Sequence, residues 1–245
     1  MQNSPLWPRL IGHRGAAKWA PENTLASFFC AADMGAQWVE LDVRLCKGGI
    51  PVVFHDPTLE RTTNGLGRVA EHRLDELRSL DAGSWFSRRF KDEPIPTLEE
   101  ALDVIAKLGM GVNIELKPDP ENVRETARRA LEAARLVWPE SAPPPLISSF
   151  DAEALEEASS LGLGWPLGYL AGRFESRHLE KALALKTGSF HLAAHGLRQD
   201  QIDALHQAGM RVFAYTVNDL SQARQLLAMG VDAIFTDDPK ILDPH

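Results

Sequence analysis

The sequence predicts an α/β fold, a TIM-type (β/α)8 barrel that forms a single domain over residues 1–245. Eight short apolar segments typical of strands occur along the chain, and most are separated by segments with helical spacing of apolar side chains. About eight strand–helix units in roughly 250 residues is typical of such a barrel. A doubly wound open sheet is the alternative, but it usually has fewer strands and often a glycine-rich first turn, which is missing from this sequence.

Each expected element has a local signal in the sequence. The expected strands cover residues 9–12, 38–44, 111–116, 145–149, 165–170, 189–193, 211–216 and 233–236. Helical periodicity is found at 24–34, 97–108, 122–137, 151–161, 199–207 and 220–229. Residues of the capping type stand where helices are expected to begin, among them Thr24, Thr97, Asp151 and Asp219.

One long segment interrupts this alternation. Residues 56–96 lie between the second strand and the helix that begins at Thr97, with only a short helical stretch expected near 74–80. Segments of this length without regular structure are uncommon unless they are functional. Because this segment follows the carboxyl end of a strand, where barrel active sites lie, we expect a small inserted subdomain over the site.

The charge and composition exclude several classes of protein. The net charge of -8 argues against nucleic acid and against anionic membrane surfaces as partners. No run of about 18 apolar residues is present, so we expect no stable membrane insertion. The first ten residues lack the apolar segment of a signal peptide. With two cysteines outside any metal-binding pattern, the sequence favours a cytoplasmic location.

The second expected strand carries two acidic side chains on one face. Side chains alternate along a strand, so Val39, Leu41 and Val43 are expected to point outward, beneath the helices. Glu40 and Asp42 then point into the barrel near its carboxyl end. Two carboxylates on one inward face repel each other unless a cation or a proton lies between them.

The third expected strand repeats this arrangement, with Asn113, Glu115 and Lys117 pointing inward. Glu40, Asp42 and Glu115 should therefore meet at one level of the barrel. Carboxylate oxygens suit a hard divalent cation, Mg²⁺ or Ca²⁺. The alternative is a structural ion-pair cluster around Lys117, but buried charge is costly to keep for structure alone.

Two histidines follow strand-like segments at the same end of the predicted barrel. His13 directly follows the first strand, and His55 follows a short apolar run at 50–54. A pair of histidines can act as general base and general acid. Arg14, beside His13, can neutralise a phosphate through forked hydrogen bonds.

Several other polar residues have more than one interpretation. Glu22 and Asn23 fit either an ordinary helix start or a role in orienting the metal ligands and the first loop. Tyr215 is expected at the carboxyl end of a strand, where it can line a pocket. His191 lies in the sixth expected strand, and nothing in the sequence pairs it with the acidic cluster.

An ordered set of motifs resembles the glycerophosphodiester phosphodiesterase family, of the bacterial cytosolic type. The set comprises His13-Arg14-Gly15, Pro21-Glu22-Asn23-Thr24, Glu40-Leu41-Asp42-Val43, His55-Asp56, Arg61-Thr62-Thr63-Asn64-Gly65, Glu115-Leu116-Lys117, Ser149-Phe150, Thr216-Val217-Asn218 and Gly230-Val231-Asp232-Ala233-Ile234-Phe235-Thr236-Asp237. Each motif is weak alone, but the ordered set covers nearly the whole chain and is highly specific.

The resemblance implies a metal-dependent hydrolase acting on small glycerophosphodiesters, such as glycerophosphocholine or glycerophosphoethanolamine, to give glycerol 3-phosphate and an alcohol. It implies that His13 and His55 are the acid–base pair and that Arg14 and Lys117 hold the phosphate. Glu40, Asp42 and Glu115 would be the metal ligands.

This sequence has Tyr215 where relatives often have tryptophan, which bears on substrate specificity. Two other functions remain open: a phospholipase-type enzyme acting on lysolipids, and a non-catalytic barrel that binds anions.

Overall fold

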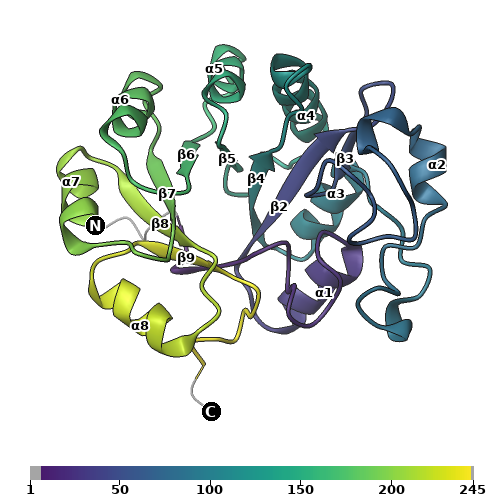
Figure 1. Cartoon of the computed structure of the whole chain (residues 1–245), viewed down its shortest axis with the longest axis horizontal. Helices are drawn as coiled ribbons and strands as arrows, with labels where there is room; N and C mark the ends of the chain where they lie inside the picture. Colours follow the sequence, from purple (N-terminus) through teal and green to yellow (C-terminus); the bar gives the residue numbers. More distant parts are fainter. Residues whose placement is uncertain (1–6, 244–245) are drawn as a thin grey trace.

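A computed structural model describes residues 7–243 of the chain as a closed barrel of eight parallel strands ringed by helices (Figure 1). The barrel strands are β1 (Leu10–Gly12), β2 (Trp38–Leu45), β4 (Gly111–Leu116), β5 (Leu146–Ser149), β6 (Leu167–Ala171), β7 (Ser189–Ala193), β8 (Arg211–Tyr215) and β9 (Ala233–Thr236). Pairing runs in order from β2 through β4 to β9, then to β1, which closes the ring by pairing with β2. The predicted TIM-type fold is confirmed. The expectation about the first ten residues lies mostly outside the described part of the chain.

The helices lie outside the ring, and most begin where the sequence predicts. They are α1 (Leu25–Asp33), α2 (Leu74–Arg78), α3 (Leu98–Lys107), α4 (Val123–Val137), α5 (Ala152–Ser160), α6 (Ser176–Ala184), α7 (Gln199–Gln207) and α8 (Leu220–Ala228). At the start of α3, the Thr97 hydroxyl accepts the Glu100 N–H and the Glu100 carboxylate accepts the Thr97 N–H. The Asp151 carboxylate caps α5 in the same way, by accepting two backbone N–H groups.

Helix α6 was not among the helices expected from the sequence. Ala182 is its one fully buried side chain within the described residues, and Leu179 is only partly buried. Its apolar residues Leu179, Ala182 and Leu183 do have helical spacing, so the signal was present in the sequence and was overlooked.

The barrel interior changes character along the strands. At the amino ends the inward side chains form an apolar cluster that includes Trp38, Leu146 and Phe213. Two residues further along β2, the same face presents Glu40 and then Asp42. The apolar layer therefore supports a polar layer at the carboxyl end of the barrel.

The segment between β2 and α3 adds structure beside the ring. Strand β3 (Pro51–Val53) pairs antiparallel with β2, and two short 3₁₀ helices, η1 (Val69–Glu71) and η2 (Arg88–Phe90), flank α2. This segment packs around its own apolar cluster: Cys46, Val52, Phe54, Leu59, Val69, Leu77, Ala82 and Ile95. Figure 1 shows α2 outside the barrel on the side of β3. Within residues 7–243, no helix combines the length and the apolar character needed to cross a membrane.

The barrel interior leaves no room for a side chain at Gly168. A Cβ atom at Gly168 would lie 2.6 Å from His191 Nε2 and 2.9 Å from Ser189 Oγ, both of which are buried. Gly168→Ala should therefore lower the free energy of unfolding by about 1–3 kcal/mol through overpacking. Gly172→Ala, where a Cβ would meet nothing within 4 Å, is the control. Urea unfolding that gives equal stabilities for the two variants would contradict this packing.

Candidate active site

Glu40, Asp42 and Glu115 meet at the carboxyl end of the barrel. One oxygen of each carboxylate lies within 4.8 Å of the others. Strands β2 and β4 pair in parallel with Asp42 opposite Glu115, so the alternation of side chains places all three on the inner face at adjacent levels. All three residues are buried. The convergence expected from the strand pattern is present.

Each carboxylate has one oxygen that the described residues leave without a hydrogen bond: Glu40 Oε1, Asp42 Oδ1 and Glu115 Oε1. The protein anchors the cluster through other atoms. Glu40 Oε2 accepts the Arg14 backbone N–H at 2.8 Å, and Asp42 Oδ2 accepts the Asn23 side-chain amide at 2.8 Å. Glu40 Oε1 faces no donor among the described residues, and the free oxygens of Asp42 and Glu115 face only the Lys117 ammonium. Converging carboxylate oxygens of this kind are a suitable ligand set for a hard divalent cation.

Lys117 is the cation that faces this cluster from β4's end. Its Nζ lies 2.5 Å from Glu115 Oε1 and 3.5 Å from Asp42 Oδ1. Burial alone would lower the pKa of Lys117, but Asp42 and Glu115 hold it above its ordinary value. One ammonium group therefore partly offsets the charge of the cluster.

Without a bound cation, two of the three carboxyl groups have a raised pKa. Burial, together with Asp42 and Glu115, raises the pKa of Glu40 well above its ordinary value. Burial also raises the pKa of Glu115 to about 7, although Lys117 opposes this effect. For Asp42, burial would raise the pKa, but the cations of Arg14 and Lys117 hold it below its ordinary value. A bound cation would replace the protons on the other two carboxylates.

Arg14 contacts the acidic cluster from the loop after β1. Its Nε lies 3.2 Å from Asp42 Oδ2, and its terminal nitrogen lies 2.6 Å from Glu22 Oε1. The backbone of Arg14 has a φ of 52°, which turns its N–H toward Glu40. This conformation is uncommon for a residue with a side chain and is characteristic of functional loops. Arg14 and Lys117 thus place two cations beside the carboxylates.

His13 is anchored by a carboxylate from the far end of the chain. Its Nδ1 lies 2.6 Å from Asp237 Oδ1, just beyond β9. Asn218 donates its side-chain amide to the other Asp237 oxygen at 2.5 Å and accepts the Asp237 backbone N–H. An Nδ1–H that donates to Asp237 leaves Nε2 as the proton acceptor of the ring.

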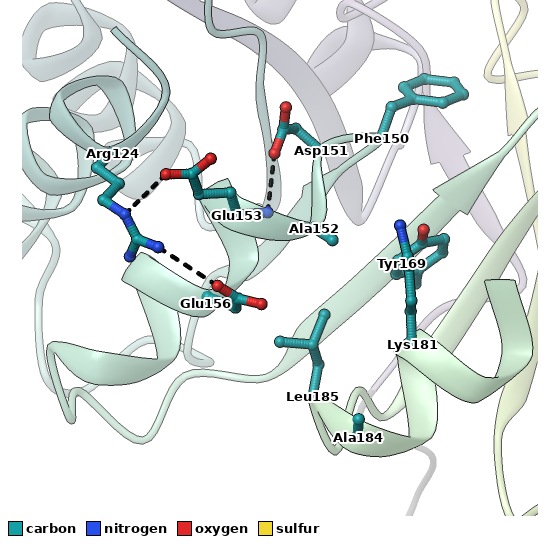
Figure 2. Close-up of a pocket in the computed structure, with 10 residues that line it drawn as sticks. All are labelled: Arg124, Phe150, Asp151, Ala152, Glu153, Glu156, Tyr169, Lys181, Ala184 and Leu185. Atoms are coloured by element: carbon teal, nitrogen blue, oxygen red, sulfur yellow. Dashed lines mark hydrogen bonds and ion pairs between the residues drawn. The ribbon is translucent and has the colours of Figure 1, made fainter. Parts of the chain in front are cut away.

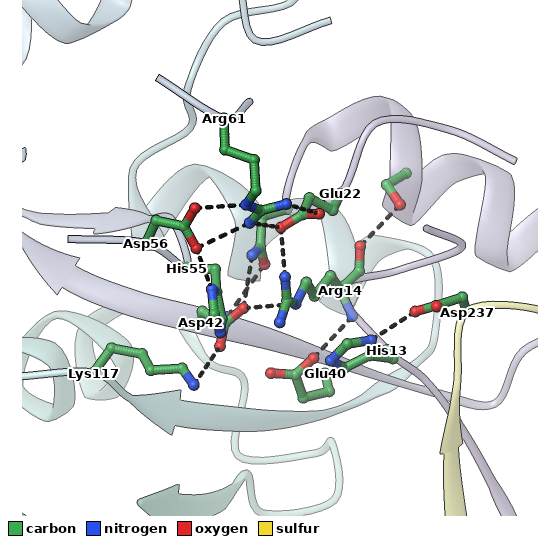
Figure 3. A network of polar contacts seen from close by, with 12 residues as sticks. His13, Arg14, Glu22, Glu40, Asp42, His55, Asp56, Arg61, Lys117 and Asp237 are labelled. Carbon is green, nitrogen blue, oxygen red and sulfur yellow. Dashed lines mark hydrogen bonds and ion pairs between the residues drawn. The ribbon is translucent and has the colours of Figure 1, made fainter. Parts of the chain in front are cut away.

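His55 has a matching arrangement on the other side. Its Nδ1 lies 2.5 Å from Asp56 Oδ1, and Arg44 fixes its backbone by donating to the His55 carbonyl at 2.7 Å. Burial lowers the pKa of His55. In the view of Figure 3, Arg14, Asp42 and Glu40 lie between the two histidines. Two imidazoles with anchored Nδ1 atoms can therefore serve one anion held between them.

Several partners in this network escaped the sequence analysis. Asp237, Asp56 and Arg61 each contact a predicted site residue or its partner, and Glu22 takes part in two ion pairs. The motifs of Asp56, Arg61 and Asp237 were part of the family resemblance, but the sequence assigned no individual role to these three residues. Glu22 had been considered for orienting the metal ligands and the first loop. Contacts between loops from different parts of the chain determine these roles.

Tyr215 lies at the wall of a small cavity below the carboxylates. The cavity is lined by His13, Glu40, Asn113, Glu115, Ser148, Leu170, His191, Tyr215 and Phe235. The Tyr215 hydroxyl donates to the Ala171 carbonyl at 3.0 Å, and its ring meets Phe150 edge-on at 5.9 Å. Lys117 Nζ lies 5.3 Å from the centre of the Phe150 ring. Tyr215 and Phe150 thus form an aromatic wall on the Lys117 side of the site.

A separate hollow lies outside the barrel, between α5 and α6 (Figure 2). Its charged side chains largely pair with one another, since Arg124 contacts Glu153 at 2.8 Å and Glu156 at 3.4 Å. None of the described residues that line it belongs to the carboxylate cluster or is a histidine. The candidate active site is therefore the carboxyl end of the barrel.

A parallel barrel with acidic, basic and imidazole groups gathered at its carboxyl end defines a TIM-barrel enzyme. A family model narrows this class: the model described as "Glycerophosphoryl diester phosphodiesterase family" matches residues 13–241. The chain belongs to this family and is a phosphodiesterase.

Curated relatives and solved structures agree with this assignment. A glycerophosphodiester phosphodiesterase of Caldanaerobacter subterraneus is 35% identical over 95% of each chain. One from Bacillus subtilis is 32% identical over 94% of this chain and 84% of the relative. A phosphodiesterase of Oleispira antarctica, solved in complex with the product sn-glycerol-3-phosphate, is 42% identical with a TM-score of 0.92, covering 95% of this chain and 94% of the other.

The buried carboxylates predict a specific pH dependence of stability. Glu115 has a pKa of about 7 in the folded chain, against an ordinary value of 4.5. The stabilisation from its bound proton is complete below pH 4.5 and is lost as the pH rises through about 7. Chelator-treated wild type should therefore lose stability relative to Glu115→Gln over this interval, as measured by Tm.

If the cluster binds a cation, added Mg²⁺ or Ca²⁺ should raise the Tm of wild type at pH 8 and have a smaller effect on Glu115→Gln, because the variant lacks one carboxylate of the cluster. A constant Tm difference between the two proteins from pH 4.5 to 8 would refute the raised pKa of Glu115.

Proposed function

We propose that this protein hydrolyses small glycerophosphodiesters, such as glycerophosphocholine or glycerophosphoethanolamine, to glycerol 3-phosphate and an alcohol. The proposal rests mainly on one observation: three buried carboxylates converge at the end of the barrel that also carries two carboxylate-anchored histidines. The product bound by the relative from Oleispira antarctica supports the same class of substrate.

Glu40, Asp42 and Glu115 would hold a divalent cation, Mg²⁺ or Ca²⁺, in this proposal. When bound, such a cation supplies Lewis-acid polarisation of a non-bridging phosphate oxygen. Arg14 and Lys117 offset the remaining negative charge of the phosphate as it reacts. Tyr215 and Phe150 border the substrate on the Lys117 side.

His13 and His55 divide the proton transfers between them. One imidazole accepts a proton from the attacking hydroxyl through Nε2, and the other, protonated, donates a proton to the departing alkoxide. Asp237 and Asp56 keep each ring oriented and stabilise the charge that develops on it. The attacking oxygen belongs either to water, which gives glycerol 3-phosphate directly, or to the 2-hydroxyl of the substrate's own glycerol, which gives a cyclic phosphate that water then opens to glycerol 3-phosphate. Either route needs this pair.

We also propose that residues 1–245 act as one barrel domain, with 56–96 as an inserted subdomain at the active-site end. A separate apolar cluster supports this division, because Leu59, Val69, Leu77, Ala82 and Ile95 of this segment pack together against residues 46–54. The acidic net charge of -8 favours a small diffusible substrate in the cytoplasm over nucleic acid or an anionic membrane.

Turnover of glycerophosphocholine tests the proposal directly. Chelation should abolish hydrolysis, and Mg²⁺ or Ca²⁺ should restore it, because the carboxylates need a cation to bind the phosphate. Glycerol 3-phosphate release is measured beside a lysophosphatidylcholine reaction. Full activity in chelator would refute metal dependence, and faster cleavage of the lysolipid would favour a phospholipase-type enzyme instead.

His13→Ala and His55→Ala should each lower kcat by about 10²–10⁴, the usual contribution of one general acid or base. The control is His206→Ala, because His206 also pairs with a carboxylate, Asp232 at 2.9 Å, but lies on the outer helix α7. Both active-site variants should keep the wild-type Tm, since both rings are partly exposed at the rim. Turnover in either variant equal to that of His206→Ala would remove that histidine from its proposed role.

A further inference from the structure

Arg61 joins two loops at the edge of the candidate site. Its guanidinium donates to both oxygens of Asp56, at 2.5 and 3.1 Å, and to both oxygens of Glu22, at 2.7 and 2.8 Å. Asp56 follows His55, whereas Glu22 belongs to the loop before α1 (Figure 3). One planar side chain from the segment 56–96 therefore satisfies two carboxylates that lie far apart in the sequence.

Asp56 and Glu22 also contact two residues with proposed roles in the reaction, His55 and Arg14. Asp56 Oδ1 contacts His55 Nδ1 at 2.5 Å, and Glu22 Oε1 contacts a terminal nitrogen of Arg14 at 2.6 Å. Arg61 is thus linked through one carboxylate to His55, a proposed acid–base residue, and through another to Arg14, a proposed phosphate ligand.

We propose that Arg61 is a positioning residue that orients His55 through Asp56 and Arg14 through Glu22, so that the inserted segment aligns both for the same phosphate. This inference rests on the proposed function. It assigns Arg61 no contact with the substrate.

The charge balance of the loops supports this role. Burial would raise the pKa of Asp56, but the hydrogen bonds from Arg61 and His55 lower it to about 2. Burial would also raise the pKa of Glu22, but Arg61 and Arg14 hold it below its ordinary value. Both groups are therefore carboxylates at neutral pH. Without Arg61, the negative charges of Asp56 and Glu22 at the edge of the site would be less well compensated and would repel an anionic substrate.

Arg61 also limits how firmly Glu22 holds Arg14. Glu22 Oε1 accepts from Arg14 at 2.6 Å and from Arg61 at 2.7 Å, so the two arginines share one oxygen. Loss of Arg61 would free both Glu22 oxygens for a forked pair with Arg14, which would draw Arg14 away from a phosphate. A lysine would keep the charge but cannot span both carboxylates with a planar fork.

Stability is a poor explanation for this arrangement. The Arg61 side chain is 44% exposed, so its loss leaves no cavity in the core; because its forked pairs with two largely buried carboxylates can stabilise the fold, Tm is measured beside the kinetic constants. Arg78 provides a matched control, since it is an arginine of the same segment with 45% side-chain exposure and an ion pair to Glu100 at 2.7 Å. Glu100 is not part of the candidate site.

Arg61→Ala, Arg61→Lys and Arg78→Ala are compared with wild type for glycerophosphocholine hydrolysis, for glycerol 3-phosphate binding by calorimetry, and for Tm. We expect Arg61→Ala to lower kcat and raise KM, with kcat/KM down about 100-fold because a small misplacement of reacting groups has effects of that size. Arg61→Lys should keep the wild-type Tm and remain impaired. Arg78→Ala should match wild type in both kinetic constants.

Guanidinium at low millimolar concentration should restore part of the activity and of the glycerol 3-phosphate affinity of Arg61→Ala, whereas methylammonium should not. Wild-type kinetics in Arg61→Lys, or an Arg61→Ala defect that guanidinium leaves unchanged, would overturn the proposal. If Arg61→Ala does not fold, Arg61→Lys decides the question by its own kinetics and affinity. Failure of wild type to hydrolyse the diester would refute the proposed function instead, and the binding measurements would still test the effect of Arg61 on Arg14.

Discussion

Mutual repulsion among three buried carboxylates is the constraint on which the rest of the site depends. Glu40, Asp42 and Glu115 face one another at the carboxyl end of the barrel, and among the described residues Lys117 is the one cation that reaches the free oxygens of Asp42 and Glu115. Such a cluster is stable only with protons or a cation, and Lys117 offsets part of its charge. Arg14, from the loop after β1, offsets a further part of this negative charge. A divalent cation held by the three carboxylates would offset the rest.

The loops around the cluster supply the groups that orient the two histidines. Asp237 and Asp56 each anchor the Nδ1 atom of one histidine, which leaves each Nε2 for the substrate. Under the proposed function, carboxylates would serve as metal ligands in the barrel and as supports for the histidines at its edge. The cations Arg14 and Arg61 prevent these negative charges from excluding an anionic substrate.

Local patterns in the sequence predict most of the fold and the acidic centre. Strand alternation was sufficient to place Glu40 and Glu115 on one inner face, because the parallel register of β2 and β4 preserves that alternation between strands. The rim could not be predicted in this way. The contact of His13 with Asp237 joins residues 224 positions apart, and it depends on how β1 and β9 close the barrel. Helix α6 was overlooked although its apolar residues have helical spacing.

A crystal soaked in Mn²⁺ tests the central claim most directly, because Mn²⁺ prefers the same oxygen ligands as Mg²⁺ and Ca²⁺ and scatters anomalously. We expect one strong anomalous peak between Glu40, Asp42 and Glu115, within coordination distance of all three, and its loss in Glu40→Gln. No peak at this position in wild-type crystals, or an equal peak in the variant, would contradict the claim that these carboxylates form a metal site.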